Sequence, residues 1–395
     1  MKKRILSLFL LAAILIPMNV SVPSSTVVSA ITSEEESEKM EYIEKENVVI
    51  DGHQYEYIQY CRDKQKKTIR IMSLKTKEDI LIIPAKIDGE AVLEVGGTYF
   101  EFKAREDSMV EEGFEVEKVL AWQINKEQKL KKIVVSEGIE KIIPMGFKNT
   151  EAECIEFPKS LKIIGEKNAG GACFSNSKIE HVIVKGKTTT IGSNAFLYSG
   201  LKQISLPKNF QGKICSSAFE ESKLERFVWP TYKNNATEKV GSCIFQNCRN
   251  LKEVVFPKNQ KHIYIPEACF YGCMKLKKLA FPASTKKVTY NWNPYADNYK
   301  MGARTLVFKG KKTKIVGIVR NSKKNKNVLT VGKIIAPKGS KALAYAKKAK
   351  RVKWLAKWVQ RDIRAYSGPT VNYTDGYDGR AIKYAKMKYS VLKKK

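Results

Sequence analysis

The stretch Leu251-Lys252-Glu253-Val254-Val255-Phe256-Pro257 decides the fold of this chain, because its pattern recurs before and after it. It reads apolar-x-x-apolar-x-apolar-Pro, and a variable polar loop, Ile263 and then Ala268-Cys269-Phe270 follow it. Nine segments share the front half of this pattern, and the residues at their proline position are Ser136, Pro158, Lys185, Pro207, Pro230, Pro257, Pro282, Lys309 and Pro337. Successive positions are 22 to 28 residues apart. A period of this length is typical of a solenoid.

Each repeat contains one short run with strand-like alternation. Apolar residues two apart, such as Val254 and Phe256, predict a strand, and Pro257 ends it because proline has no backbone donor. A unit this short cannot bury its apolar face alone, so it stacks on its neighbours and the core runs along the array. The strands would then be parallel and about 4.7–4.9 Å apart. We expect the phenylalanines of the return leg to form one interior column, clearest at Phe196, Phe219, Phe245 and Phe270.

The repeats resemble the leucine-rich repeats of the BspA-like bacterial surface-protein family, whose units read roughly Leu-x-x-Ile-x-Ile-Pro, then Ile-Gly, then Ala-Phe-x-x-Cys. Two stretches are close to this wording. They are Ile191-Gly192-Ser193-Asn194-Ala195-Phe196 and Phe270-Tyr271-Gly272-Cys273, and the resemblance covers most of residues 70–355. It implies a β-rich solenoid: a leucine-rich-repeat array with one short parallel strand per repeat, and loops and short helical turns on the return leg. It also implies a non-enzymatic binding or adhesion protein outside the cell, without naming the ligand.

The segments before the repeats differ from them in composition. Residues 1–30 read as a secretory signal peptide, with a basic start, an apolar run to Val20 and the small-residue site Val28-Ser29-Ala30. A membrane-anchoring helix is disfavoured, because spanning takes roughly 20 apolar residues. We expect an acidic mobile leader at 31–50, an N-terminal cap of the solenoid at 51–97, and an acidic insertion at 98–129.

After the repeats, which occupy 130–340, the chain becomes strongly basic. Residues 341–365 predict a C-terminal helical cap, and 366–395 predict either a basic tail or a truncated immunoglobulin-like module. The whole chain has a net charge of +32, and residues 338–395 hold 17 Lys or Arg against three Asp. This end is either a solvated face or a surface for anionic polymers. Candidate contacts to such a polymer are Lys323, Lys324, Lys326, Lys347, Lys348, Arg351, Lys393, Lys394 and Lys395.

Residues that carry chemistry are sparse. The three histidines, His53, His181 and His262, have no metal-ligand spacing, and no phosphate-cradling glycine loop or Gly-x-Ser-x-Gly motif is present. We therefore expect no catalytic, cofactor-binding or metal site, and no enzyme activity.

Eight cysteines in a secreted chain would ordinarily suggest disulfides. Because Cys248 and Cys273 each lie three residues after a repeat phenylalanine, buried free thiols are the favoured interpretation.

The residue between the two core-facing positions of each strand must point outward. Seven of these nine middle residues are apolar, and they form the candidate partner-binding face: Val134, Ile183, Val228, Val255, Ala280, Val307 and Ile335. Contiguous exposed apolar area tends to mark an interaction site. The alternative is that branched residues occur there only because they suit strands and pack in ladders.

These observations predict a secreted, extracellular protein, associated with the cell wall or surface, without a transmembrane anchor after signal cleavage, and monomeric. Its expected partner is a protein or glycan on a host or neighbouring cell. The alternative function is that of a wall-associated structural protein, retained on anionic envelope polymers by its basic C-terminal end. Nucleic acid is a poor candidate, because a secreted chain does not meet intracellular DNA.

Overall fold

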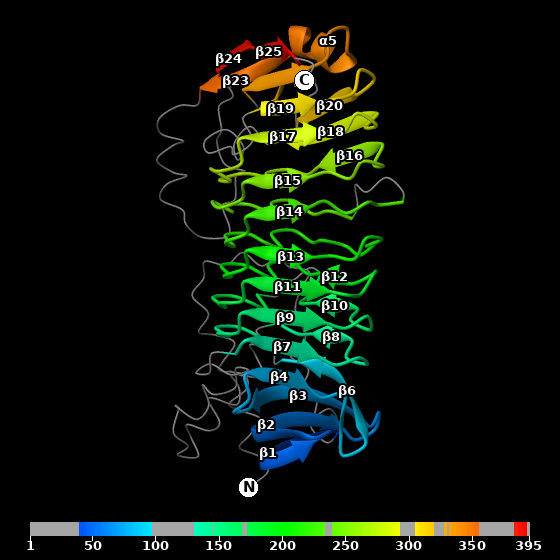
Figure 1. Ribbon diagram of the computed structural model, residues 1–395, viewed down its shortest axis with the longest axis vertical. Helices are drawn as coiled ribbons and strands as arrows, with labels where there is room; N and C mark the ends of the chain where they lie inside the picture. The colour runs from blue at the N-terminus through cyan, green and yellow to red at the C-terminus, as the bar shows by residue number, and fades with distance from the viewer. Residues whose placement is uncertain are drawn as a thin grey trace, which may run out of the picture.

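The computed structural model describes residues 39–96, 130–144, 146–167, 172–233, 239–292, 305–319, 328–329, 332–354 and 383–392. The strands of these segments stack along one long axis, from β1 near the N-terminal end to β25 and α5 at the other (Figure 1). The predicted signal peptide, residues 31–38 of the leader and the acidic insertion lie outside the described residues. Within the described residues, no helix is both long and apolar enough to cross a bilayer.

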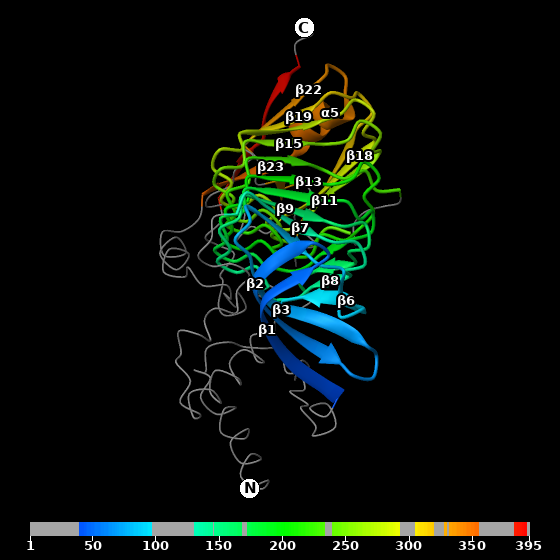
Figure 2. The same cartoon turned by 60° about the horizontal axis from the view of Figure 1, so that its bottom comes forward.

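The N-terminal cap is built from six strands, and Figure 2 turns this end of the molecule forward. They are β1 (Met40–Ile50), β2 (His53–Asp63), β3 (Thr68–Lys75), β4 (Ile80–Ile83), β5 (Lys86–Ile87) and β6 (Glu90–Val95). β1 pairs antiparallel with β2, and β2 pairs antiparallel with β3. The predicted mobile leader is therefore corrected for residues 40–50, which are strand. Ile43, Val48 and Ile50 pack against the core, and this burial offsets the entropy of ordering an acidic segment.

One strand per repeat forms the front of the molecule in Figure 1, as the sequence pattern predicts. β4 begins a parallel five-stranded sheet with β7 (Lys132–Val135), β9 (Cys154–Phe157), β11 (His181–Val184) and β13 (Gln203–Ser205). A parallel six-stranded sheet continues with β14 (Arg226–Val228), β15 (Glu253–Val255), β17 (Lys278–Phe281), β19 (Thr305–Phe308), β22 (Lys333–Ala336) and β25 (Lys388–Val391). Strands β9 and β15 end before Pro158 and Pro257, as expected.

A second short strand in many repeats was not predicted. β8 (Lys141–Ile142), β10 (Ile163–Ile164) and β12 (Thr190–Ile191) continue the sheet of β1–β3 and β6, and single bridges at Ile214 and Val240 extend the row. β16 (His262–Ile265), β18 (Lys287–Trp292) and β20 (Lys314–Val319) form a further parallel sheet. Stacking brings the backbone groups of these segments beside each other, where they pair rather than stay unsatisfied.

The return legs are short hydrogen-bonded turns, as predicted: the Leu197 N–H donates to the Asn194 carbonyl at 3.0 Å and the Ser199 N–H to the Phe196 carbonyl at 3.2 Å. After the second strand, the chain turns through residues in the left-handed region, including Asn176 (φ 56), Asn194 (φ 56) and Asn247 (φ 57). Asparagine tolerates this conformation better than most side chains. These turns place each repeat phenylalanine in the core.

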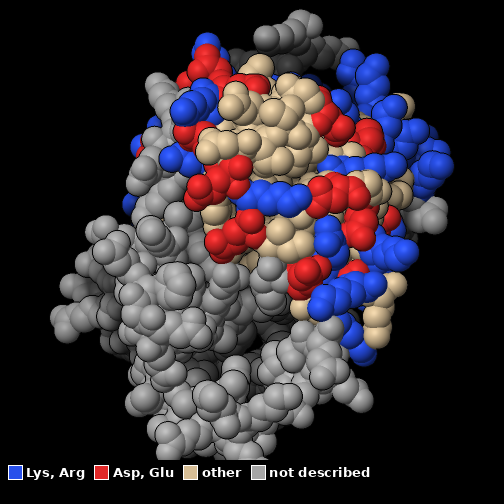
Figure 3. Space-filling view, turned by 90° about the horizontal axis from the view of Figure 1, so that it is seen from below, with Lys and Arg blue, Asp and Glu red and all other residues tan. Residues whose placement is uncertain are grey.

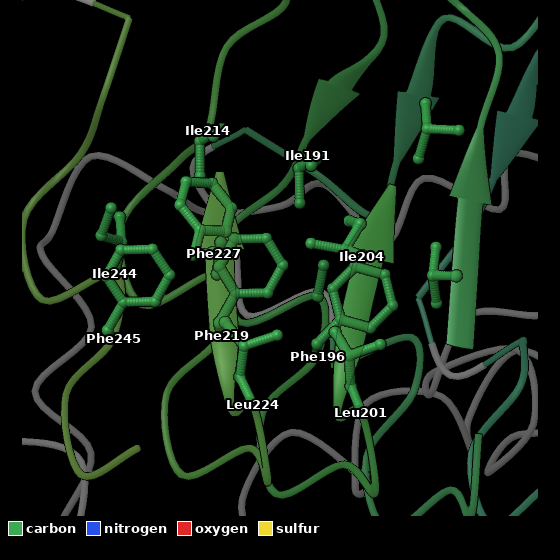
Figure 4. Close-up of a cluster of buried hydrophobic side chains, with 14 of the residues drawn as sticks. Ile191, Phe196, Leu201, Ile204, Ile214, Phe219, Leu224, Phe227, Ile244 and Phe245 are labelled. Carbon is green, nitrogen blue, oxygen red and sulfur yellow. The ribbon is translucent and has the colours of Figure 1, made fainter. Parts of the chain in front are cut away.

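The phenylalanines form the predicted interior column. Their rings stack from Phe147 through Phe174, Phe196, Phe219 and Phe245 to Phe270, with centroids 4.7 to 5.7 Å apart. Figure 4 shows Phe196, Phe219 and Phe245 of this column, with Leu201, Leu224 and Ile204 around them. A second stack, Phe256–Phe281–Phe308, lies farther along the array, with centroids 5.0 and 4.9 Å apart.

The C-terminal end closes the core with a helix and a returning strand. Helix α5 (Lys341–Lys348) begins at Ser340, whose side chain accepts a hydrogen bond from the Leu343 backbone N–H, and it buries Ala342, Leu343 and Ala346. The predicted helical cap at 341–365 is thus corrected, because the helix ends at Lys348 and β23 (Lys350–Trp354) follows. β23 lies between β21 (Val328–Leu329) and β24 (Lys383–Lys386).

Strand β25 also corrects the prediction for the last residues. It pairs in parallel with β22, so residues 388–391 belong to the solenoid sheet and not to a separate immunoglobulin-like module. The physical reason is that β22 would otherwise leave a row of edge donors and acceptors unpaired. Residues 355–382 lie outside the described part of the chain.

Candidate functional site

The outward positions of the front strands are aligned in two rows. In the five-stranded sheet, hydrogen-bonded pairing connects Ile82, Val134, Glu156, Ile183 and Ser205 in that order. In the six-stranded sheet, it connects Val228, Val255, Ala280, Val307, Ile335 and Ser390. The structure therefore brings together the seven residues singled out in the sequence, but it divides them between two sheets. Their role in binding stays a prediction.

A charged residue interrupts the row of the five-stranded sheet. The Glu156 carboxylate contacts Lys132 Nζ at 2.5 Å and also pairs with Lys185. Hydrogen bonds from these two ammonium groups lower the pKa of Glu156, so its charge is held between Val134 and Ile183. Among the described front strands, an uninterrupted apolar row occurs only in the six-stranded sheet, where it comprises Val228, Val255, Ala280, Val307 and Ile335. Val228 is 48% exposed and the other four are half-buried.

The position two residues earlier in each strand forms a polar row beside the apolar row. In the six-stranded sheet its members are Arg226, Glu253, Lys278, Thr305, Lys333 and Lys388. Arg226 Nε and Glu253 Oε2 form an ion pair at 2.9 Å. No described acid pairs with Lys278, Lys333 or Lys388, so this face combines an apolar row with a net positive one. Sequence reasoning missed Lys388 and Ser390, because only strand pairing shows that the tail joins this sheet.

The basic residues proposed as polymer contacts are only partly covered by the structure. Lys347 and Lys348 are exposed in the last turn of α5, where a positive charge complements the helix dipole. Arg351 lies in β23, paired in register with Leu329 and Ala385. The remaining six, Lys323, Lys324, Lys326, Lys393, Lys394 and Lys395, lie outside the described residues.

All eight cysteines are free thiols, and Cys61, Cys173, Cys215, Cys248, Cys269 and Cys273 are buried. Cys248 Sγ donates to the Phe219 carbonyl at 2.9 Å, and Cys273 Sγ donates to the Phe245 carbonyl at 3.0 Å. Each therefore ties one repeat to the preceding one. Burial raises the pKa of Cys248 to about 12 and also raises that of Cys273. Because the thiolate is the reactive form, these side chains act as packing groups.

We expect the buried thiols to resist modification in the folded protein. A chromogenic disulfide reagent at pH 8 should react first with Cys154 and Cys243, which are half-buried, and with Cys248 and Cys273 only after denaturant is added. Mass spectrometry of the labelled peptides identifies the order. Rapid native labelling of Cys248 or Cys273 would contradict their burial.

The histidines are distributed over separate strands. His53 begins β2, His181 begins β11 and His262 begins β16. His262 Nε2 lies 2.8 Å from Thr289 Oγ1 of the adjacent strand. Across the described segments, no group of three or more His, Cys, Asp or Glu side chains could hold a metal ion.

Comparison with known proteins identifies the repeats. A family model described as a BspA type leucine rich repeat region matches residues 122–236 and 212–296, in 6 copies. Residues 122–296 of the chain are BspA-type leucine-rich repeats. These BspA-type repeats fold into the aligned short strands and the inward-pointing phenylalanines described above.

Several solved structures are similar to this chain. The T. pallidum leucine-rich repeat protein TpLRR is 20% identical, with 60% of this chain and 84% of that chain covered and a TM-score of 0.35. The pneumococcal vaccine antigen PcpA is 17% identical, with 76% and 77% covered and a TM-score of 0.42. A leucine-rich repeat protein from Bacteroides ovatus is 14% identical, with 78% and 100% covered and a TM-score of 0.22. No curated protein matches the sequence.

Proposed function

We propose that the protein is a secreted or cell-surface, non-enzymatic binding protein that engages a partner protein through the front face of its six-stranded sheet. The observation that carries the proposal is the apolar row, in which five residues from consecutive repeats lie in register beside a row with a net positive charge. The match of residues 122–296 to BspA-type repeats supports a repeat scaffold whose extended surface serves binding.

The two rows define the partner chemistry. Strands about 4.7–4.9 Å apart place the five apolar side chains along a stripe of roughly 20 Å. Lys278, Lys333 and Lys388 run beside its C-terminal part without described acidic partners. A fitting partner is a protein surface with apolar side chains bordered by carboxylates, since apolar contact contributes affinity and opposite charge contributes orientation.

Cross-strand packing of branched residues stabilises a sheet whether or not a partner binds. The test must therefore separate binding from stability. Substituting Val228, Val255 and Val307 together by Thr keeps the branched shape and removes the apolar surface. Each change removes contact worth on the order of 1 kcal/mol, so we expect apparent affinity to fall more than about tenfold.

Binding is measured with fluorescently labelled full-length protein on cultured epithelial cells, before and after trypsin removes their surface proteins. Val134→Thr with Ile183→Thr is the matched control, because it makes the same kind of change in the other sheet. Wild type and control should bind intact cells more than trypsin-treated cells. If the triple variant keeps a native circular dichroism spectrum and binds like wild type, the sheet face is not the binding site.

A second candidate function is retention on anionic envelope polymers by the basic C-terminal end. The described residues after 253 contain 22 Lys or Arg and a single acid, Glu267. Added salt should then release the protein, because exposed charges are screened. Deleting residues 350–395 is a poor test, since it also removes β25 from the sheet. Substitutions that remove charge and keep every strand are better.

A further inference from the structure

Ten lysines gather on one side of the last repeats. They occupy the loops that follow β15, β17, β19 and β22 and the first residues of β18, β20 and α5, on the side of Figure 1 where β16, β18 and β20 are labelled. All ten are exposed, and the four loops, 258–262, 283–287, 309–314 and 338–341, contain no acid. We call this surface the lysine edge; its members are Lys258, Lys261, Lys286, Lys287, Lys309, Lys311, Lys312, Lys314, Lys338 and Lys341.

The lysine edge is held in register by backbone hydrogen bonds between successive loops. The Lys286 N–H donates to the Lys261 carbonyl at 2.8 Å, and the Lys314 N–H donates to the Lys286 carbonyl at 2.8 Å. The Lys341 N–H donates to the Lys311 carbonyl at 3.0 Å. Beneath the lysines, the buried Thr313 hydroxyl donates to the Thr285 carbonyl at 2.6 Å. The lysine stems thus project from a preorganised backbone.

The same side of the first repeats, in the loops after β7 and β9, is charge-balanced. Lys162 Nζ pairs with Glu140 at 2.6 Å, and Glu137 accepts hydrogen bonds from the backbone N–H groups of Lys159 and Ser160. The N-terminal end of the molecule likewise shows acidic and basic side chains interspersed around an uncharged area (Figure 3), with Arg62 paired to Glu41, Asp88 and Glu90. The described lysines of the lysine edge form no ion pairs with described acids. Lysines without a described acidic partner also occur in the loops after β11 and β13, at Lys187, Lys208 and Lys213. Among the described segments, the last repeats differ because such lysines continue over four successive loops, with four of them in residues 309–314.

Such an array is unfavourable without a partner. Like charges on paired positions, such as Lys287 opposite Lys314, repel each other, and a surface of one sign concentrates counter-ions. Loops about 4.7–4.9 Å apart place two to four ammonium groups in each layer over roughly 15 Å. A compact anion would reach only one or two layers. A chain with regularly spaced anionic groups, lying along the solenoid axis, would contact all four.

We propose that the lysine edge binds a linear polyanion, a chain of phosphate or sulfate groups that runs across the four loops. This site extends the retention function, and it is independent of the apolar row, which lies on the sheet face. It also differs from the helix and tail residues singled out in the sequence. The lysine edge contributes most of the binding energy through release of counter-ions from the polymer.

The test uses the full-length chain and two probes of defined length, inorganic polyphosphate and heparin. The variant K261Q/K286Q/K287Q/K314Q removes four charges from the lysine edge. We expect it to bind at least about tenfold more weakly at physiological salt, and the slope of log K against log salt to flatten by about 3. Each probe should raise the Tm of the wild type more than that of the variant, because a ligand of the native state stabilises it.

The matched control is K159Q/K187Q/K208Q/K223Q, which removes the same charge from exposed positions in earlier repeats. A second control, K347Q/K348Q, tests the helix. Loss of affinity in the lysine-edge variant alone supports the proposal. The probe whose affinity falls more in this variant identifies phosphate or sulfate as the preferred group. Equal loss in the first control, or unchanged binding by the lysine-edge variant with an intact fold, overturns it. V228T/V255T/V307T should bind both probes like wild type, which separates this site from the sheet face.

Discussion

Replacing Phe219 by alanine is expected to lower the free energy of unfolding by about 3–5 kcal/mol. The Phe219 side chain is 0% exposed, and its ring stacks between Phe196 at 5.6 Å and Phe245 at 5.7 Å. Alanine would remove these two contacts and a third, with Phe227 at 5.8 Å, and would leave a cavity in the middle of the column. The neighbouring rings cannot close it, because each is fixed by its own repeat.

Denaturant unfolding followed by circular dichroism measures this effect. Tyr198→Ala is the control, since Tyr198 is an aromatic residue on the same return leg as Phe196 but is 46% exposed. We expect the control to change stability by less than about 0.5 kcal/mol, as is usual for surface positions. A decrease below about 1 kcal/mol for Phe219→Ala would contradict a continuous column.

Gly212→Ala is expected to destabilise the protein by roughly 3 kcal/mol, at the upper end of typical overpacking effects. A Cβ atom at Gly212 would lie 1.8 Å from the Thr189 carbonyl oxygen and 2.7 Å from Phe210 Cζ. The Thr189 oxygen belongs to the backbone of the preceding repeat and cannot rotate away. Stacked repeats would have to separate locally to admit one methyl group.

Gly339→Ala provides the comparison for this prediction. Gly339 has a positive φ of 71, yet nothing lies within 4 Å of an added Cβ. Its substitution should cost only the backbone strain, about 1–2 kcal/mol. The two midpoints of denaturation, measured side by side, distinguish close packing from backbone strain. If Gly212→Ala is no more destabilising than Gly339→Ala, the close approach of these repeats is wrong.

Several features follow from local pattern alone. Alternation at Val254 and Phe256 determines which side chains of a strand face the core, because successive residues point to opposite faces. Recurrence of this alternation every 22 to 28 residues then requires stacked parallel strands, since no repeat can bury its apolar face alone. The phenylalanine column and the alignment of Val228, Val255 and Val307 are consequences of that one period.

Other features depended on contacts between distant residues. From its composition, the leader segment 40–50 is acidic and expected to be unstructured. In the structure it pairs with the edge of β2, and Ile43, Val48 and Ile50 pack against the core. β25 reads as part of a basic tail, but it completes the edge left by β22. Strand pairing of this kind depends on which edges remain open after the rest has folded, and composition carries no such information.

The candidate sites show the same division. The sequence by itself determined that the chain is a repeat solenoid, which residues face outward from its strands, and that positive charge gathers toward its C-terminal end. Only the tertiary structure decided that the outward row is divided between two sheets and that Lys261, Lys286 and Lys314 stand in successive layers of one edge. These lysines are about a repeat apart along the chain, and only stacking reduces that separation to the distance between neighbouring strands.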